Sequence, residues 1–278
     1  MMRARVIGLA VAAALSCSAC GVPAVMQPGR SVVSSAQARM LKTFPVGAVF
    51  DYQIGGPYAP AANVGIVDRD RSQKGVEGRF NVCYVNAYQV QPGEIGWWKK
   101  EHPALLLRDR DGALVMDEQW GEPLFDISTA AKRTELATIV GVWFAGCARL
   151  GHDAVEPDNL DSYTRSKGML QQSDAVAFAV DLVRQAHTYK MLIGQKNDAE
   201  LAPQLSKSGY DFAIAEECQT YGECGAYADV YGGKVIEIEY DAKSFAAACK
   251  ARAGKVSLLL RDRGVVAEGR PGYVDRTC

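Results

Sequence analysis

The stretch Asp153-Ala154-Val155-Glu156-Pro157-Asp158-Asn159-Leu160-Asp161-Ser162-Tyr163 places four acids, an amide and a tyrosine around one proline. Proline lacks an N–H and forces the preceding residue out of the helical region, so residues 156–159 are predicted to end a strand. Carboxylates this close repel one another and shift each other's pKa values. The pattern therefore indicates a catalytic or ion-binding site, with an acidic solvated loop as the alternative.

Eight short runs rich in β-branched and aromatic residues are predicted as strands. They cover residues 48–52, 64–67, 79–85, 153–156, 190–195, 212–215, 234–240 and 255–260.

Three segments between these runs have helical periodicity. Residues 127–150 carry an apolar stripe with a period of about 3.6 residues, and Ser128 is the expected N-cap. Residues 173–187 and 244–253 are the other two predicted helices. Strands that alternate with helices predict a parallel sheet, and eight strands in one chain of this length fit a single (β/α)8 TIM barrel. A doubly wound open sheet is the rival fold, but the sequence contains no G-x-G-x-x-G turn to support it.

In a TIM barrel the active site lies at the C-terminal ends of the strands. Every predicted strand here ends in charged or hydrogen-bonding side chains, with an excess of carboxylates over small turn residues. These side chains are Asp51, Gln53, Asp68, Asn86, Asp158, Asn159, Lys196, Asn197, Asp198, Glu216, Glu239, Tyr240, Arg261 and Asp262. We therefore expect a functional barrel mouth.

The N-terminus resembles an export signal. Two arginines precede the ten-residue apolar run 6–15, which is shorter than the roughly 20 residues that span a bilayer. Cys20-Gly21 resembles a lipobox, although Cys17 stands where leucine is usual. We expect residues 1–20 to be a signal peptide, 21–45 a tether and 46–278 the catalytic domain. The exported protein is then either a lipoprotein anchored through Cys20 or a secreted, extracellular one.

Lipidation can be tested by replacing Cys20. If acyl chains on Cys20 hold the protein at the membrane, Cys20→Ala should release it into the medium. Fractionation of cells that express either form measures this, and an unchanged distribution would count against a lipoprotein.

Composition excludes some partners and suggests disulfides. A net charge of -1 with 23% charged residues provides no large basic field for nucleic acid. Beyond the leader there are six cysteines, an even number that suggests three disulfides with 15 connectivities open. Metal binding is poorly supported, because the three histidines lie far from the single close cysteine pair. We expect neither a metal nor another cofactor.

Four ordered segments resemble glycoside hydrolase family 114, and the resemblance covers residues 46–278. The family pattern runs E/D-P-D-N-x-D-x-Y, K-N-D, N-E-Q-C-x-x-Y-x-E-C and V-E-Y. The matching segments here are 156–163, 196–198, 215–224 and 238–240. Ala215 and Glu217 depart from the third motif, where the family has asparagine and glutamine.

The resemblance implies an endo-α-1,4-polygalactosaminidase on a TIM barrel. Asp158 would be the nucleophile or base and Glu216 the proton donor, with Glu156 and Glu217 as their competitors. The residues expected to bind the amino-sugar polysaccharide are Asp51, Asp68, Glu156, Asn159, Tyr163, Lys196, Asn197, Glu239 and Tyr240. Lys196 could bind a hydroxyl or only pair with a catalytic carboxylate. The alternative function is a non-catalytic surface lipoprotein that binds saccharide or a partner protein.

Proximity in the expected barrel suggests one set of disulfides, because bridged Cα atoms must lie within about 7 Å. Cys147 would reach Cys83 from the inner face of its helix, Cys218 would pair with Cys224, and Cys249 would bind Cys278. The long connection 86–127 carries Trp97, Trp98 and Trp120, which could serve a sugar subsite or pack under the loop.

Overall fold

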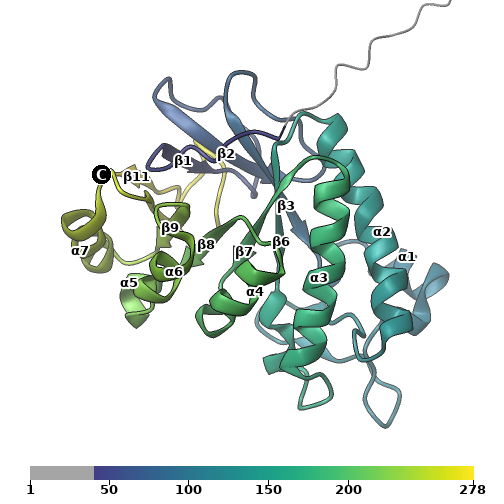
Figure 1. The fold of residues 1–278 in the computed structure, drawn as a ribbon. Helices are drawn as coiled ribbons and strands as arrows, with labels where there is room; N and C mark the ends of the chain where they lie inside the picture. Colours follow the sequence, from purple (N-terminus) through teal and green to yellow (C-terminus); the bar gives the residue numbers. More distant parts are fainter. Residues whose placement is uncertain (1–40) are drawn as a thin grey trace, which may run out of the picture. The chain divides into compact units, whose positions relative to one another are not determined.

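The computed structural model describes residues 41–278, so the expected signal peptide, Cys20 and most of the tether lie outside the described residues. Eight parallel strands form a barrel in the order β1-β2-β3-β6-β7-β8-β9-β10 (Figure 1). Their bounds are Val49–Tyr52, Val64–Asp70, Phe80–Asn86, Ala154–Asp158, Leu192–Lys196, Phe212–Glu216, Val235–Glu239 and Ser257–Arg261. The predicted TIM barrel is confirmed, and all eight predicted strands are present.

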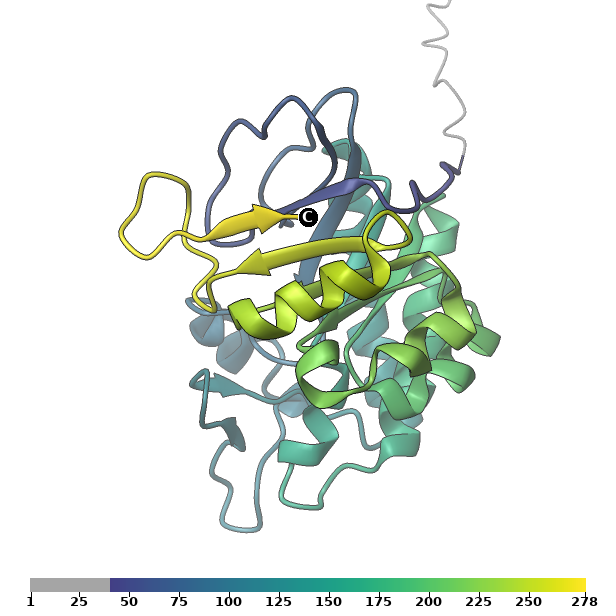
Figure 2. The ribbon, with the colours of Figure 1, turned by 90° about the vertical axis from the view of Figure 1, so that its left-hand side faces the viewer.

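The barrel is closed between its first and last parallel strands by side chains and a ninth strand. Strand β11, Asp275–Thr277, pairs antiparallel with β10 (Figure 2). Ser257 Oγ on β10 donates to the carbonyl of Ala48 at 2.7 Å, and Arg261 Nε donates to the carbonyl of Tyr52 at 3.1 Å. These bonds bring β1 against β10 where no regular ladder joins them in the described chain.

Helices flank only part of the barrel. The larger ones are α2 (Ala130–Arg149), α3 (Gln172–Thr188), α4 (Ala202–Ser208), α6 (Cys224–Tyr231) and α7 (Ala242–Arg252). The connections after β1 and β2, residues 53–63 and 71–79, contain no helix, so the side of the barrel at β1 and β2 carries none (Figure 1).

The shorter elements lie in connections. They are α1 (Ile95–Glu101), α5 (Cys218–Tyr221), the 3₁₀ turns Pro103–Leu105, Leu160–Arg165 and Ala199–Leu201, and the hairpin β4 (Met116–Asp117) with β5 (Glu122–Pro123). Most of them extend the loops that follow the strands.

Two predicted helix starts are wrong by a few residues. Thr129, not Ser128, caps α2 by accepting a hydrogen bond from the amide of Lys132 at 3.3 Å, because the Ser128 hydroxyl is bound to Asp126. The last helix starts at Ala242 rather than Ser244, since the Asp241 carboxylate accepts from the Ser244 amide and acts as the cap.

Alternation along the strands divides the core into two parts. Inside the barrel, a buried cluster is built from Phe44, Phe50, Tyr52, Ile66, Phe80, Val82, Ala154, Leu192, Phe212, Ile214, Ile236, Ile238, Leu259 and Val265. The opposite strand faces join the helices in a larger cluster that includes Val85, Val155, Ile193, Leu136, Phe144, Phe178 and Leu182. The apolar cluster fills the interior of the barrel. The inward-facing side chains beyond it, near the C-terminal ends of the strands, can therefore be polar.

All three expected disulfides are confirmed. The bridged Cα atoms are 6.1 Å apart in Cys83–Cys147, 4.8 Å in Cys218–Cys224 and 5.7 Å in Cys249–Cys278. The last bridge holds the end of β11 to α7. Three disulfides fit a protein that folds in an oxidising compartment.

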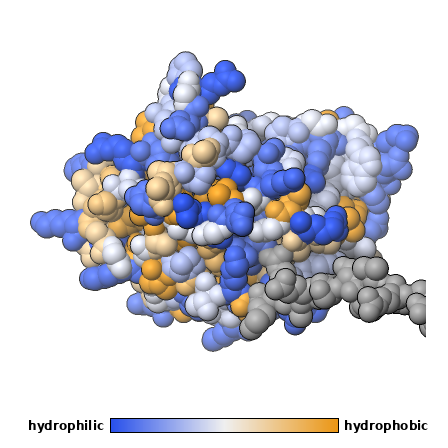
Figure 3. Space-filling model, turned by 90° about the horizontal axis from the view of Figure 1, so that it is seen from above, coloured by the Kyte–Doolittle hydropathy of each residue, from blue (hydrophilic) through white to orange (hydrophobic). Residues whose placement is uncertain are grey.

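Exposed large apolar side chains in the described chain include Trp97, Trp120, Val142 and Tyr221. Figure 3 shows hydrophilic and hydrophobic residues mixed on the face seen from above. Within residues 41–278 no helix is both long and apolar enough to cross a membrane.

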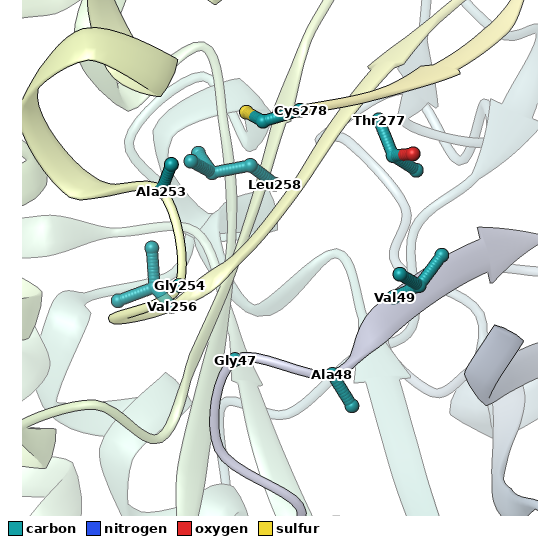
Figure 4. A pocket seen from close by; sticks show the side chains of 9 residues that line it. All are labelled: Gly47, Ala48, Val49, Ala253, Gly254, Val256, Leu258, Thr277 and Cys278. Atoms are coloured by element: carbon teal, nitrogen blue, oxygen red, sulfur yellow. The ribbon is translucent and has the colours of Figure 1, made fainter. Parts of the chain in front are cut away.

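A small pocket opens at the N-terminal ends of β1 and β10 (Figure 4). Gly47 approaches Gly254 so closely here that a Cβ on Gly47 would meet the Gly254 carbonyl oxygen at 2.7 Å. Apart from Thr277 and the disulfide of Cys278, the lining is aliphatic or glycine. This end of a TIM barrel serves stability, so the pocket is not the candidate site.

Candidate active site

Three consecutive strands, β6, β7 and β8, end in the charged residues Asp158, Lys196 and Glu216. The ammonium of Lys196 lies 2.9 Å from Glu156 Oε1, 3.5 Å from Asp158 Oδ1 and 3.5 Å from Glu216 Oε2. Lys196 and Glu156 are buried, whereas the side chains of Asp158 and Glu216 are 17% and 24% exposed. One cation thus joins two partly open carboxylates and one buried carboxylate.

The distance between the two open carboxylates is limited by this shared lysine. Both oxygens lie 3.5 Å from the same Nζ atom, so they are at most twice that distance, 7.0 Å, apart. The two carboxylates therefore lie close together at the barrel mouth. Burial alone would lower the pKa of Lys196, but Asp158, Glu156 and Glu216 raise it well above its ordinary value. Lys196 is a charge partner of all three.

Neutral side chains orient each open carboxylate. The Tyr84 hydroxyl donates to Asp158 Oδ2 at 2.8 Å. Asn197 Nδ2 donates to Glu216 Oε2 at 2.9 Å, while Asn197 Oδ1 accepts from the Glu216 amide at 2.8 Å. Tyr240 donates to the other oxygen of Glu216. The expected residues Asn197 and Tyr240 therefore contact a candidate catalytic acid directly.

The backbone turns into the left-handed region immediately after each of these three strand ends. Asn159, Asn197 and Glu217 have φ values of 66°, 53° and 57°. Side chains other than glycine rarely adopt this conformation, although asparagine does so more readily than most. These turns aim the preceding side chains into the barrel mouth, and strained backbone of this kind is common at functional sites.

A second pair of acids lies deeper in the barrel. Asp68 is fully buried, and in the described chain no N–H or hydroxyl group donates to its carboxyl. Burial and the neighbouring Glu156 raise the pKa of Asp68 well above its usual value, which favours the neutral form of Asp68 beside Glu156. Glu156 also accepts from Tyr52 at 3.3 Å. Asp68 was expected to bind substrate, but it is sealed below the mouth.

Two other expected substrate ligands lie on the outer face of the barrel. Asp51 binds the Tyr58 hydroxyl at 2.5 Å and Gln53 at 2.7 Å. Glu239 accepts from the Gln219 amide and the Thr220 hydroxyl, both at 2.8 Å. The structure does not bring Asp51 or Glu239 to the mouth, because adjacent residues of a strand point to opposite faces.

Three further predicted positions flank the mouth. Asn159 donates to Asn86 Oδ1 at 2.9 Å, and the hydroxyl of Tyr163 donates to Asp198 at 3.1 Å. Glu217, the competitor of Glu216, is bound by Arg263 and lies apart from the lysine cluster. The structure therefore separates the two glutamates as strand alternation predicts.

The three tryptophans of the long connection have different surroundings. Trp98 is fully buried, and its ring centroid is 4.4 Å from that of Phe125, so it packs under the loop. Trp97 and Trp120 are 46% and 59% exposed. Trp97 stands beside Arg71, Glu94 and Trp143 around a pocket of about 200 Å³ on the flank of the barrel.

Three residues near the acids were not predicted to take part in the site: Tyr52, Tyr84 and Glu122. Tyr52 on β1 is the register partner of Asp68, and Tyr84 on β3 is the register partner of Glu156, so knowledge of the strand register would have indicated them. Glu122 lies far along the chain, in β5, and accepts from Asn86 at 2.8 Å. No spacing rule marks it, because only the folding of the hairpin brings it to the mouth.

One cysteine-containing group could at first suggest a metal site. Cys218, Cys224 and Glu237 lie together, but the two sulfurs form a disulfide and Arg252 binds both oxygens of Glu237. Thiolate ligands are therefore absent from this group.

The family model described as Glycoside-hydrolase family GH114 matches residues 31–278. A barrel with paired acids at its mouth is the architecture of a glycoside hydrolase, and the chain belongs to this family. No curated protein sequence matches the chain.

Two solved structures show the same fold. The structure of Aspergillus fumigatus Ega3 in complex with galactosamine is 24% identical, covers 86% of this chain and 99% of its own, and has a TM-score of 0.68. The glycoside hydrolase domain of PelA from Pseudomonas aeruginosa is 14% identical, covers 83% and 97%, and has a TM-score of 0.57.

Proposed function

We propose that this protein is an exported glycoside hydrolase that cleaves an α-1,4-linked, galactosamine-containing polysaccharide, with Asp158 and Glu216 as its catalytic acids. The observation that carries the proposal is the arrangement of these two partly open carboxylates around Lys196 at the ends of β6 and β8. Lys196, Asn197 and Tyr240 orient the pair, and Asn159 and Tyr163 flank it.

The chemistry requires one acid to protonate the leaving oxygen and one carboxylate to attack the anomeric carbon or activate water. We assign the first role to Glu216 and the second to Asp158. Carboxyl separations of about 5–5.5 Å accompany retention and about 6.5–9.5 Å inversion. The upper limit of 7.0 Å applies to one oxygen of each carboxyl, Asp158 Oδ1 and Glu216 Oε2, and is compatible with both ranges, so the anomer released first decides between retention and inversion.

The substrate class follows from the relatives and from charge. Ega3, which has the same fold, was solved with galactosamine bound. Acids outnumber bases at the mouth, since Glu156, Asp158 and Glu216 surround the single Lys196. Such a site attracts cationic sugars. The N-terminal leader and three disulfides support export.

The test is an assay of the purified protein on α-1,4-linked galactosamine polymer, with a neutral α-1,4-glucan as the control. We expect new reducing ends from the first polymer and none from the second. Proton NMR of early products would reveal the α-anomer first if the configuration is retained. Binding without cleavage would contradict the hydrolase and support a saccharide-binding surface protein.

A further inference from the structure

The β4–β5 hairpin holds a fixed position beside the candidate active site. Asp117, which is buried, accepts from the amide of Gln119 at 3.0 Å and from the side chain of Gln89 at 3.1 Å. Its second oxygen also lies 2.7 Å from Arg165 Nε, on the turn that follows β6. Asp117 therefore stabilises the turn of the hairpin and also connects the hairpin to the segment that follows Asp158.

Glu122 stands directly opposite Asp117 in this hairpin and reaches the end of β3. Its Oε2 accepts from Asn86 Nδ2 at 2.8 Å, and Asn86 is the register partner of Asp158 in the β3–β6 ladder. The other oxygen, Oε1, receives no hydrogen bond from the described residues, and the side chain is partly exposed. Glu122 thus offers a carboxylate oxygen next to the catalytic acid.

The surroundings of Glu122 contain more negative than positive charge. Burial raises the pKa of Glu122 to about 7, and the nearby charges of Asp158 and Asp117 also raise it. The hydrogen bond from Asn86 and the charge of Arg165 lower the pKa of Glu122 but do not outweigh these effects. Arg165, the base that faces it, is bound to Asp117 and Asp161. A cation brought by a ligand would relieve this imbalance.

We propose that Glu122 is a specificity-determining residue that binds the ammonium group of an unacetylated amino sugar beside Asp158. This assignment rests on the proposed function, because it gives that same site its preference for the free amine. An N-acetyl group carries no charge and gains no ionic attraction from the carboxylate. A free ammonium forms a charge-assisted hydrogen bond with the open oxygen.

The test compares Glu122→Gln with Glu118→Gln, which alters an exposed acid on the same turn. Both changes are made in full-length Glu216→Gln protein, which keeps the charge of Asp158 and in which turnover is expected to be at least roughly 100-fold slower. Calorimetry measures the binding of an α-1,4-linked galactosamine oligomer and of its N-acetylated form. We expect Glu122→Gln to weaken binding of the amine oligomer by roughly tenfold, the size of one charge-assisted hydrogen bond. The acetylated oligomer and Glu118→Gln should show no change.

The pH dependence provides a second readout. Below pH 7 Glu122 is mostly protonated and neutral, whereas above pH 7 it is ionised. Affinity for the amine oligomer, whose ammonium is protonated in acid, should therefore rise as the pH increases toward 7, and Glu122→Gln should remove this rise.

The proposal is overturned if Glu122→Gln leaves the affinity for the amine unchanged, if no binding occurs, or if both oligomers weaken equally. Glu122-dependent binding in a protein whose wild type cleaves neither polymer would instead refute the proposed hydrolysis and uphold the role of Glu122.

Discussion

Asp158→Asn and Glu216→Gln should each lower kcat/KM on galactosamine polymer by at least roughly 100-fold, since general acid–base contributions are typically 10²–10⁴-fold. Both substitutions keep the shape of the side chain and remove the ionisable oxygen. Tyr84 can still donate to the amide oxygen that the first substitution leaves at position 158, and Asn197 can still donate to the one at position 216. Steady-state kinetics on the purified variants measures the effect, with thermal unfolding as the check on folding.

Glu217→Gln is the matched control, one residue along the chain from Glu216. Its carboxylate is bound by Arg263 rather than by Lys196, so activity should fall by no more than a few-fold. An inactive Glu217→Gln beside an active Glu216→Gln would contradict the assignment of the proton donor.

Lys196→Met should reduce both stability and activity. The substitution leaves the fully buried Glu156 without its cation, and breaking a buried ion pair in this way costs about 3–5 kcal/mol. Asp158 and Glu216 lose their shared charge as well, so kcat should fall by roughly 10²-fold, the effect of removing one preorganised electrostatic group. Denaturant unfolding and initial rates measure the two losses.

The double variant Lys196→Met, Glu156→Gln separates the two effects. Removing both members of the buried pair should restore much of the stability, because no fully buried charge is then left unpaired. Activity should stay low, since Asp158 and Glu216 still lack the ammonium. A double variant that regains both would assign Lys196 a purely structural role. Asp68→Asn should be mild, because burial beside Glu156 raises the pKa of Asp68 and already favours its neutral form.

Periodicity was sufficient to predict the barrel, because its eight strands and the helices α2, α3 and α7 have their own local patterns, although the shorter α4 and α6 were not predicted. The strand-end rule also placed Asp158, Lys196 and Glu216 correctly at one end of the barrel. It failed for Asp51 and Glu239, which lie near strand ends but on the outer face. Identifying the face required knowing the register, which is set by pairing with neighbouring strands rather than by the strand itself.

The sequence also could not predict how deeply each acid is buried in the barrel. Asp68 follows the predicted strand 64–67 and Asp158 ends its strand, yet β2 continues to Asp70 and buries Asp68 fully, while Asp158 is partly open. Asp153, the first acid of the opening stretch, lies at the other end of the barrel, where it binds Lys42 and the amide of Asn81. Glu122 was missed because a hairpin, not a strand end, carries it. Long-range packing decides each of these positions.

The left-handed turns after β6, β7 and β8 limit how this protein could be made more heat-resistant. A non-glycine residue in that conformation costs about 1–2 kcal/mol, which glycine would avoid. Glycine would also make the unfolded chain more flexible and offset much of the gain. At Asn197 it would remove the amide that holds Glu216. Efforts to raise the melting temperature should therefore target the helix-free loops 53–63 and 71–79, where compatible prolines could stiffen the unfolded chain and leave the catalytic turns intact.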